Sequence, residues 1–270
     1  MTETVGTADM TATPHRIMAP KSPPGPAVAA LEVARRALRK YFRTPGLFVM
    51  GMVQSGMFLF SFRYVFGGAV TVGGVSYVDY LVPGYVATIV LFTGGGIAVA
   101  VAEDRAGGFT DRLLSLPVAR SSIVLGRAAA DFATNLWSIL FTAALGLAFG
   151  FRAPDGAAHA LAALGLCALY GLVFTLVFLV IGLIAPNAQA AQGMSMIAFV
   201  LAFISSTYVP AGTMPGWLQP FAKYQPITPM VDAVRSVLAG STSDVTLALI
   251  WSAALLVVAT PIAIARYRRA

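Results

Sequence analysis

The stretch "YLVPGYVATIVLFTGGGIAVAVAEDRAGGFTDR", residues 80–112, changes abruptly from apolar to charged. Residues 80–102 contain no Lys, Arg, Asp or Glu, whereas five of the ten residues in 103–112 are charged. A second apolar run follows at residues 128–151. An apolar run of about 20 residues can cross the hydrocarbon core of a bilayer as a helix. The stretch therefore predicts a membrane helix that ends at a charged loop.

The composition of the whole chain agrees with a membrane protein. The chain is 58% apolar and only 11% charged, with a mean hydropathy of +0.79. A soluble domain is typically about 45–50% apolar and about 25% charged. These values exclude an ordinary soluble globule, because its surface could not be covered with polar groups. The net charge of +7 is typical either of nucleic-acid binding or of contact with an anionic membrane face.

Six segments are long and apolar enough, or nearly so, to be membrane helices. They are Leu47–Phe66, Tyr80–Ala102, Ala128–Phe151, Ala157–Ile184, Gly193–Val209 and Val245–Ala265. We therefore expect an all-α integral membrane fold in which residues 45–270 form one six-span domain. Residues 1–26 are polar and rich in Pro and Thr, so they predict a disordered cytoplasmic tail.

The distribution of basic residues predicts the orientation of these spans. If the N-terminus is cytoplasmic, 14 of the 18 Lys and Arg lie in cytoplasmic segments, and the other four lie outside. The positive-inside rule then places both termini in the cytoplasm of a multi-pass protein of the cell membrane. The basic charge is explained by this asymmetry, so no nucleic-acid partner is expected.

Residues 27–44 have helical periodicity, with apolar residues on one side and basic residues on the other. The basic side carries Arg35, Arg36, Arg39 and Lys40. This pattern predicts an amphipathic interface helix on the inner membrane surface. It fits a simple anchor on membrane lipid and a platform for a protein partner equally well.

Polar and small residues interrupt the apolar spans at several positions. Arg127, Asp131 and Asn135 are four residues apart and so share one helix face, where Arg127 is the expected partner of Asp131. These three residues fit a polar contact that holds neighbouring helices together and a contact with a substrate equally well. The other positions are Gln54 and Ser55 in the first span and Gly94, Gly95 and Gly96 in the second, where small residues permit close helix packing or a hinge.

Residues 210–244 contain five prolines, at 210, 215, 220, 226 and 229. The segment is too apolar for a free loop and too interrupted for a span, so short re-entrant or interfacial helices on the outer face are expected.

The chain has no phosphate-binding motif of the form G-x-x-x-x-G-K-[ST]. With one cysteine and two histidines it offers no metal cluster, and no catalytic set is recognisable. We therefore expect no enzyme activity and no cofactor bound by this chain. If the function of the protein uses ATP, another chain hydrolyses it.

The sequence resembles the permease subunits of type-2 ABC exporters, and in particular the daunorubicin-resistance permease group. The resemblance rests on "FRYVFGGAV" at 62–70, "YLVPG" at 80–84, "EDRAGGFTDRLLSLPVARSSIVLGRAAAD" at 103–131 and "VPAGTMPGWLQPFAKYQPITPMVDAVR" at 209–235. These motifs occur in the family's order and cover most of residues 30–240.

The resemblance implies a permease that exports drugs, antibiotics or lipids of hydrophobic or amphipathic character. It implies that two permease chains pair, as a homodimer or a related heterodimer, above separate ATP-binding subunits that use ATP and Mg. It also implies an ATPase-coupling role for the first cytoplasmic loop, at Glu103, Asp104, Gly108, Arg112 and Pro117.

Three alternatives to an ATP-driven drug exporter remain open. The first is an exporter of the same class whose cargo is an endogenous lipid or glycolipid. A secondary transporter or channel would require discontinuous helices around charges in mid-membrane, and few such charges are present. A membrane enzyme would require a clustered catalytic set.

Overall fold

The computed structural model describes residues 31–32, 35, 39, 45–66, 76–108 and 120–269. Within these residues the chain is helical and contains no strand. The helices are α2 (Pro45–Ser61), which continues as the π-helix η1 (Phe62–Phe66), α3 (Tyr77–Ala106), α5 (Arg120–Ala148), α6 (Ala157–Ile184), α7 (Ala188–Phe203), the 3-10 helix η2 (Ala211–Thr213), α8 (Gln219–Tyr224), α9 (Ile227–Leu238) and α10 (Val245–Arg269).

Four helices of the described chain are long and apolar enough to cross a membrane, namely Tyr77–Ala106, Leu125–Ala148, Ala157–Ile184 and Val245–Arg266. At about 1.5 Å per residue each is as long as the ~30 Å hydrocarbon core. The protein is therefore an all-helical integral membrane protein. The predicted tail at residues 1–26 lies outside the described residues. Of the predicted interface helix only four residues are described, all of them helical.

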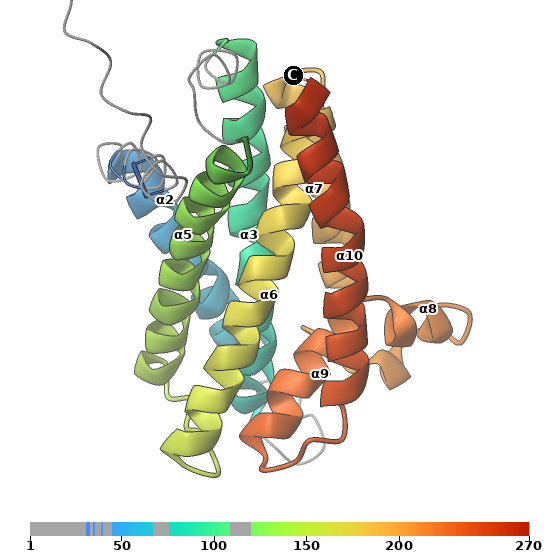
Figure 1. Ribbon diagram of the computed structural model, residues 1–270. Helices are drawn as coiled ribbons and strands as arrows, with labels where there is room; N and C mark the ends of the chain where they lie inside the picture. Colours follow the sequence, from blue (N-terminus) through green and yellow to red (C-terminus); the bar gives the residue numbers. More distant parts are fainter. Residues whose placement is uncertain are drawn as a thin grey trace, which may run out of the picture.

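Helix α3 lies at the centre of the bundle (Figure 1), where it contacts α5, α6, α7 and α9. Of the 18 consecutive residues that form its most apolar stretch, 72% are buried inside the protein, against 22% for the corresponding stretch of α10. This difference follows from position, because α10 packs mainly against α6 and α9 and leaves much of its apolar surface facing outwards. An apolar helix surface is stable in that position because the surrounding solvent is lipid.

Small residues allow α3 and α6 to approach closely. A methyl group added at Gly94 would overlap the ring of Phe178 on α6, and one added at Gly182 would come within 2.5 Å of the backbone oxygen of Ala98. The ring of Phe178 is fully buried. The glycines at 94–96 differ from one another. A methyl group added at Gly95 would lie 3.6 Å from Ser195, an ordinary contact distance, and one added at Gly96 would meet no atom within 4 Å.

The bundle has two distinct ends (Figure 1). The end of α3, the start of α5, the turn between α6 and α7 and the C-terminus lie together at what we call the loop end, at the top of the view. The connection between α5 and α6 lies at the opposite end, with α9 nearby; we call this the α9 end. The segment with five prolines contains three short helices, η2, α8 and α9.

Candidate functional site

At the loop end, Arg127 of α5 joins two carboxylates from different helices. Its guanidinium donates to Asp104 of α3 and, through Nε, to Asp131 of α5 at 2.8 Å. This is the i,i+4 contact expected from the spacing, together with a third member from α3. The three side chains are only 12–18% exposed. Charges this buried are tolerated when each is paired, and removing one partner leaves an uncompensated charge that costs several kcal/mol, about 3–5 in typical cases.

Arg105 connects the same end of α3 to α6. Its guanidinium donates to the carbonyl oxygens of Leu183 and Ala185, the latter at 2.8 Å. These carbonyls lie in the last turn of α6 and just after it, where no later helical N–H is available to them. Two consecutive residues of the charged stretch, Asp104 and Arg105, therefore tie α3 to two of its neighbours, α5 and α6.

The remaining predicted coupling residues differ in their surroundings. Glu103 is exposed on the last turns of α3. Gly108 has a φ of +65°, a left-handed conformation that suits a residue without a side chain just after a helix. Arg112 and Pro117 lie outside the described residues. In the interface helix, Arg35 and Arg39 are helical and exposed, whereas Arg36 and Lys40 lie outside the described residues.

Asn135 occupies the middle of the bundle and is completely buried. Its amide nitrogen donates to Thr175 Oγ1 at 2.7 Å and to the Gly171 carbonyl at 3.3 Å, both on α6. Its amide oxygen accepts from Thr93 of α3. These contacts join the three helices α3, α5 and α6.

The polar pair in the first predicted span is divided between two environments. Ser55 is buried, and its Oγ lies 3.0 Å from Thr142 Oγ1, which joins α2 to α5. Gln54, its neighbour, is exposed. The structure therefore brings Ser55 into the helix packing and leaves Gln54 on the outer surface of the bundle.

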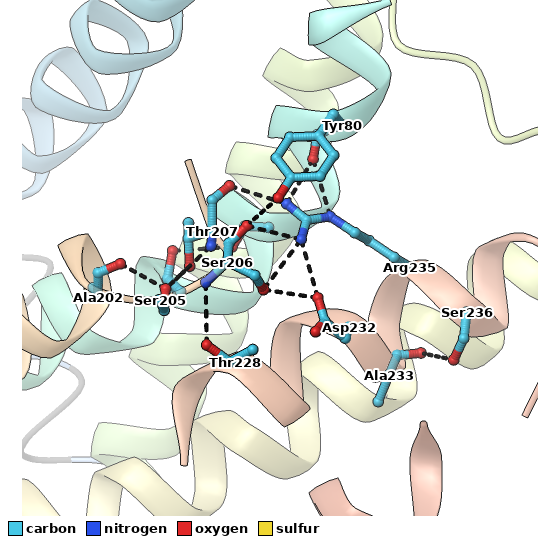
Figure 2. A network of polar contacts seen from close by, with 12 residues as sticks. Tyr80, Ala202, Ser205, Ser206, Thr207, Thr228, Asp232, Ala233, Arg235 and Ser236 are labelled. Atoms are coloured by element: carbon cyan, nitrogen blue, oxygen red, sulfur yellow. Dashed lines mark hydrogen bonds and ion pairs between the residues drawn. The ribbon is translucent and has the colours of Figure 1, made fainter. Parts of the chain in front are cut away.

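A second polar network, near the α9 end, is absent from the sequence-based predictions (Figure 2). Arg235 of α9 donates to the Tyr80 carbonyl at 2.9 Å, the Ser206 carbonyl at 2.9 Å and the Thr207 carbonyl at 3.0 Å. It also pairs with Asp232 at 3.2 Å, and its guanidinium carbon lies 3.7 Å from the centre of the Tyr80 ring. We call this the Arg235 network.

The Arg235 network satisfies the backbone where α7 stops. Residues 204–209 turn and bend after α7 without forming a helix, yet Ser205, Ser206 and Thr207 are buried. Irregular backbone at membrane depth is stable only when protein groups take up its carbonyl and amide groups. The Tyr80 hydroxyl adds a bond of 2.6 Å to the Ser206 carbonyl.

Two features of the sequence point to this network once the structure is known. Asp232 and Arg235 are three residues apart in an apolar helix, and Gly84 in "YLVPG" leaves room for them. A methyl at Gly84 would come within 2.7 Å of the Arg235 guanidinium and 2.8 Å of the Thr207 carbonyl. Burial raises the pKa of Asp232, while the hydrogen bond from Ser206 and the charge of Arg235 act in the opposite direction.

We call the contacts of Arg127 with Asp104 and Asp131 the Arg127 junction. In the part of the chain that the structure describes, no three His, Cys, Asp or Glu side chains are placed to hold a metal ion. The Arg127 junction and the Arg235 network each connect helices, and they lie at opposite ends of the bundle. An arrangement of this kind is suited to transmitting a displacement applied at one end of the helices.

Comparison with known proteins gives the family. The model of the family described as "ABC-2 type transporter" matches residues 29–239. The chain is 28% identical over 236 residues to the daunorubicin resistance ABC transporter permease protein DrrB1 of Streptomyces coeruleorubidus, covering 86% of this chain and 83% of that protein. It is 29% identical over 177 residues to the probable doxorubicin resistance ABC transporter permease protein DrrC of Mycobacterium tuberculosis (strain CDC 1551 / Oshkosh), covering 64% of each. Because the family match spans well over half of the chain, this protein belongs to the ABC-2 type transporter family and is a transmembrane permease subunit of an ATP-binding-cassette exporter.

Proposed function

We propose that this permease exports hydrophobic or amphipathic compounds and is driven by a separate ATP-binding subunit that uses ATP and Mg. The names of the relatives support a drug or antibiotic as the cargo, since they refer to daunorubicin and doxorubicin resistance. The chain has no phosphate-binding loop of its own, which supports hydrolysis on another subunit. A second permease chain, identical or related, completes the transporter.

The proposed topology has six spans with both termini in the cytoplasm. Helix α2 and η1 form one helical run, Pro45–Phe66, which at about 1.5 Å per residue is long enough for a span. Helix α7 is shorter, and the segment that follows it extends its path towards the α9 end. On this topology the loop end is cytoplasmic, the basic helix at 27–44 lies on the inner surface, and η2, α8 and α9 are the short helices of the outer face.

The observation that carries the proposal is the junction around Arg127. Helix α3 continues to Ala106, so the charged residues 103–105 lie on its last turns, ahead of the predicted cytoplasmic loop. Glu103 is exposed there, and the next two residues are bonded to α5 and α6. A partner that pushes on this loop therefore acts on three helices at once. We propose that the ATP-binding subunit docks at the exposed Glu103 at the end of α3 and moves these helices through Asp104 and Arg105.

The test is a charge reversal of the exposed residue, Glu103→Lys. Because Glu103 faces outwards, the change leaves the Arg127 junction intact and costs little stability. Membrane abundance should stay normal while cargo-stimulated ATP hydrolysis and transport fall by about tenfold or more, the equivalent of a lost 1.4 kcal/mol or larger contact. Asp244→Lys is the matched control, since Asp244 is also exposed but lies beside α10 near the α9 end.

Two results would contradict the coupling role. One is full transport by the Glu103→Lys permease. The other is an equal loss of transport in the Asp244→Lys control, which would assign the effect to charge in general. Reversal at Glu103 is also expected to weaken co-purification of the ATP-binding subunit.

We propose that the cargo follows a path between the two permease chains. The spans present apolar side chains with few charges, and a hydrated ion would need fixed polar ligands in place of its water shell. The drug and lipid alternatives are separated by reconstituting the complex and measuring ATP hydrolysis with daunorubicin, with phospholipids and with glycolipids. Stimulation by a hydrophilic sugar or ion alone would contradict both.

A further inference from the structure

An apolar crevice of about 100 Å³ lies between α3, α5, α6 and α9 near the α9 end. Its walls include Val86 of α3, Ala143 and Leu147 of α5, and Ala163 and Cys167 of α6. Pro83 lines another part of the wall, and as a proline it has no N–H to continue the hydrogen-bond ladder of α3. The crevice is separate from the Arg127 junction and from the Asn135 contacts.

The chemistry of the crevice excludes a polar ligand. Its lining side chains are all hydrocarbon except for the thiol of Cys167, so they provide no partners for a water molecule. Cavities of this kind stay dry and take up apolar molecules; an engineered cavity of about 150 Å³ holds benzene. Drug-sized ligands need pockets of about 300–1,000 Å³. The crevice therefore suits a short hydrocarbon segment and is too small for a whole cargo molecule.

The position of the crevice identifies the source of that hydrocarbon. Leu147 on its rim is 60% exposed, and both α5 and α6 are candidate spans, so the crevice opens towards the surrounding lipid. Cys167 lies ten residues into α6, or about 15 Å from its start. A position about 15 Å along a spanning helix lies within the ~30 Å hydrocarbon core, where the acyl chains of the lipids are found.

We propose that this crevice binds a segment of one acyl chain of a membrane lipid. On the proposed topology the lipid belongs to the outer leaflet. The bound segment fills the space between α3, α5 and α6. These are the three helices that Asp104 and Arg105 join at the loop end. This lipid site is defined by the lining of the crevice alone and does not depend on the identity of the cargo.

Photolabelling of the full-length permease tests the proposal. The permease is reconstituted in phosphatidylethanolamine and phosphatidylglycerol vesicles that contain a phosphatidylcholine with a diazirine at the middle of one acyl chain. After illumination, residue-resolved mass spectrometry of the 160–167 peptide should find the label on the buried crevice residues Ala163 and Cys167, and not only on the exposed Leu161 and Ala162. Ala163→Leu, which fills the crevice, should lower this labelling several-fold. Ala162→Leu is the matched control, because Ala162 is exposed on the same helix.

A second pair of variants keeps the test decisive if Ala163→Leu fails to fold. Leu164→Ala enlarges the crevice and should raise labelling of the 160–167 peptide, whereas Leu161→Ala removes an exposed side chain that does not line it and should leave labelling unchanged. Equal labelling within each pair would overturn the proposal. Displacement of the lipid label by daunorubicin would also overturn it, by assigning the crevice to cargo.

Discussion

At the scale of single residues, three consecutive glycines of α3 have three different environments. Gly94 lies against the buried ring of Phe178, Gly95 leaves ordinary contact distance to Ser195, and Gly96 faces open space. The sequence presents them as one small-residue group, and the bundle separates them because successive helix residues point about 100° apart. Of these three glycines only Gly94 is required for the close approach of α3 and α6, to which Gly182 contributes from the α6 side.

Single alanine substitutions should separate these environments. Gly94→Ala forces its new methyl into Phe178 and should lower stability by about 1–3 kcal/mol, the usual cost of overpacking a core. Gly96→Ala, the matched control, meets no atom and should leave stability unchanged or raise it by up to about 1 kcal/mol, because alanine restricts the unfolded chain. Thermal unfolding of the purified permeases measures both. Equal melting temperatures for the two variants would contradict the assignment of the contact to Gly94.

At the scale of elements, the irregular segment after α7 depends on a helix that follows it in the chain. The carbonyls of Ser206 and Thr207 accept from Arg235 of α9. Arginine suits this role because its planar group presents five donors in a fixed arrangement, whereas lysine presents a point charge. Helix α9 therefore holds the end of α7 against the start of α3, where Tyr80 completes the contact.

Arg235→Lys should loosen the segment without removing the charge. We expect faster amide hydrogen exchange in residues 204–210, since one ammonium group cannot serve three carbonyls and Asp232 together. Lys223→Arg, a similar exchange of basic residues at an exposed position of α8, is the control and should leave that exchange unchanged. Unaltered protection in the Arg235→Lys permease would show that other bonds hold the segment.

At the scale of the whole molecule, the two ends of the bundle should face opposite sides of the membrane. Single cysteines placed in a Cys167→Ala background report their accessibility to an impermeant thiol reagent. Ala106→Cys and Asn187→Cys at the loop end should react only after the cells are permeabilised. Asp155→Cys and Asp244→Cys near the α9 end should react in intact cells. Labelling of position 106 in intact cells would reverse the proposed topology.

The sequence by itself determined the class of the protein and the residues that meet at short range. Apolar runs of spanning length predict membrane helices because a bilayer demands them, and a spacing of four placed Arg127 beside Asp131 because that spacing is one turn of a helix. The family was recognisable from its ordered motifs. The number of spans and the docking of the ATP-binding subunit stay predictions.

Only the tertiary structure decided which helices these residues join. Asp104 meets Arg127 across 23 positions and Arg235 meets Tyr80 across 155, contacts that no local periodicity encodes. The selection of Gly94 alone from its triplet, and of Cys167 as the wall of a crevice, likewise depends on which faces of α3 and α6 turn towards each other. In a membrane nearly every residue of a span is apolar whether it faces lipid or protein, so hydrophobic pattern identifies the helices and leaves their mutual rotation to packing.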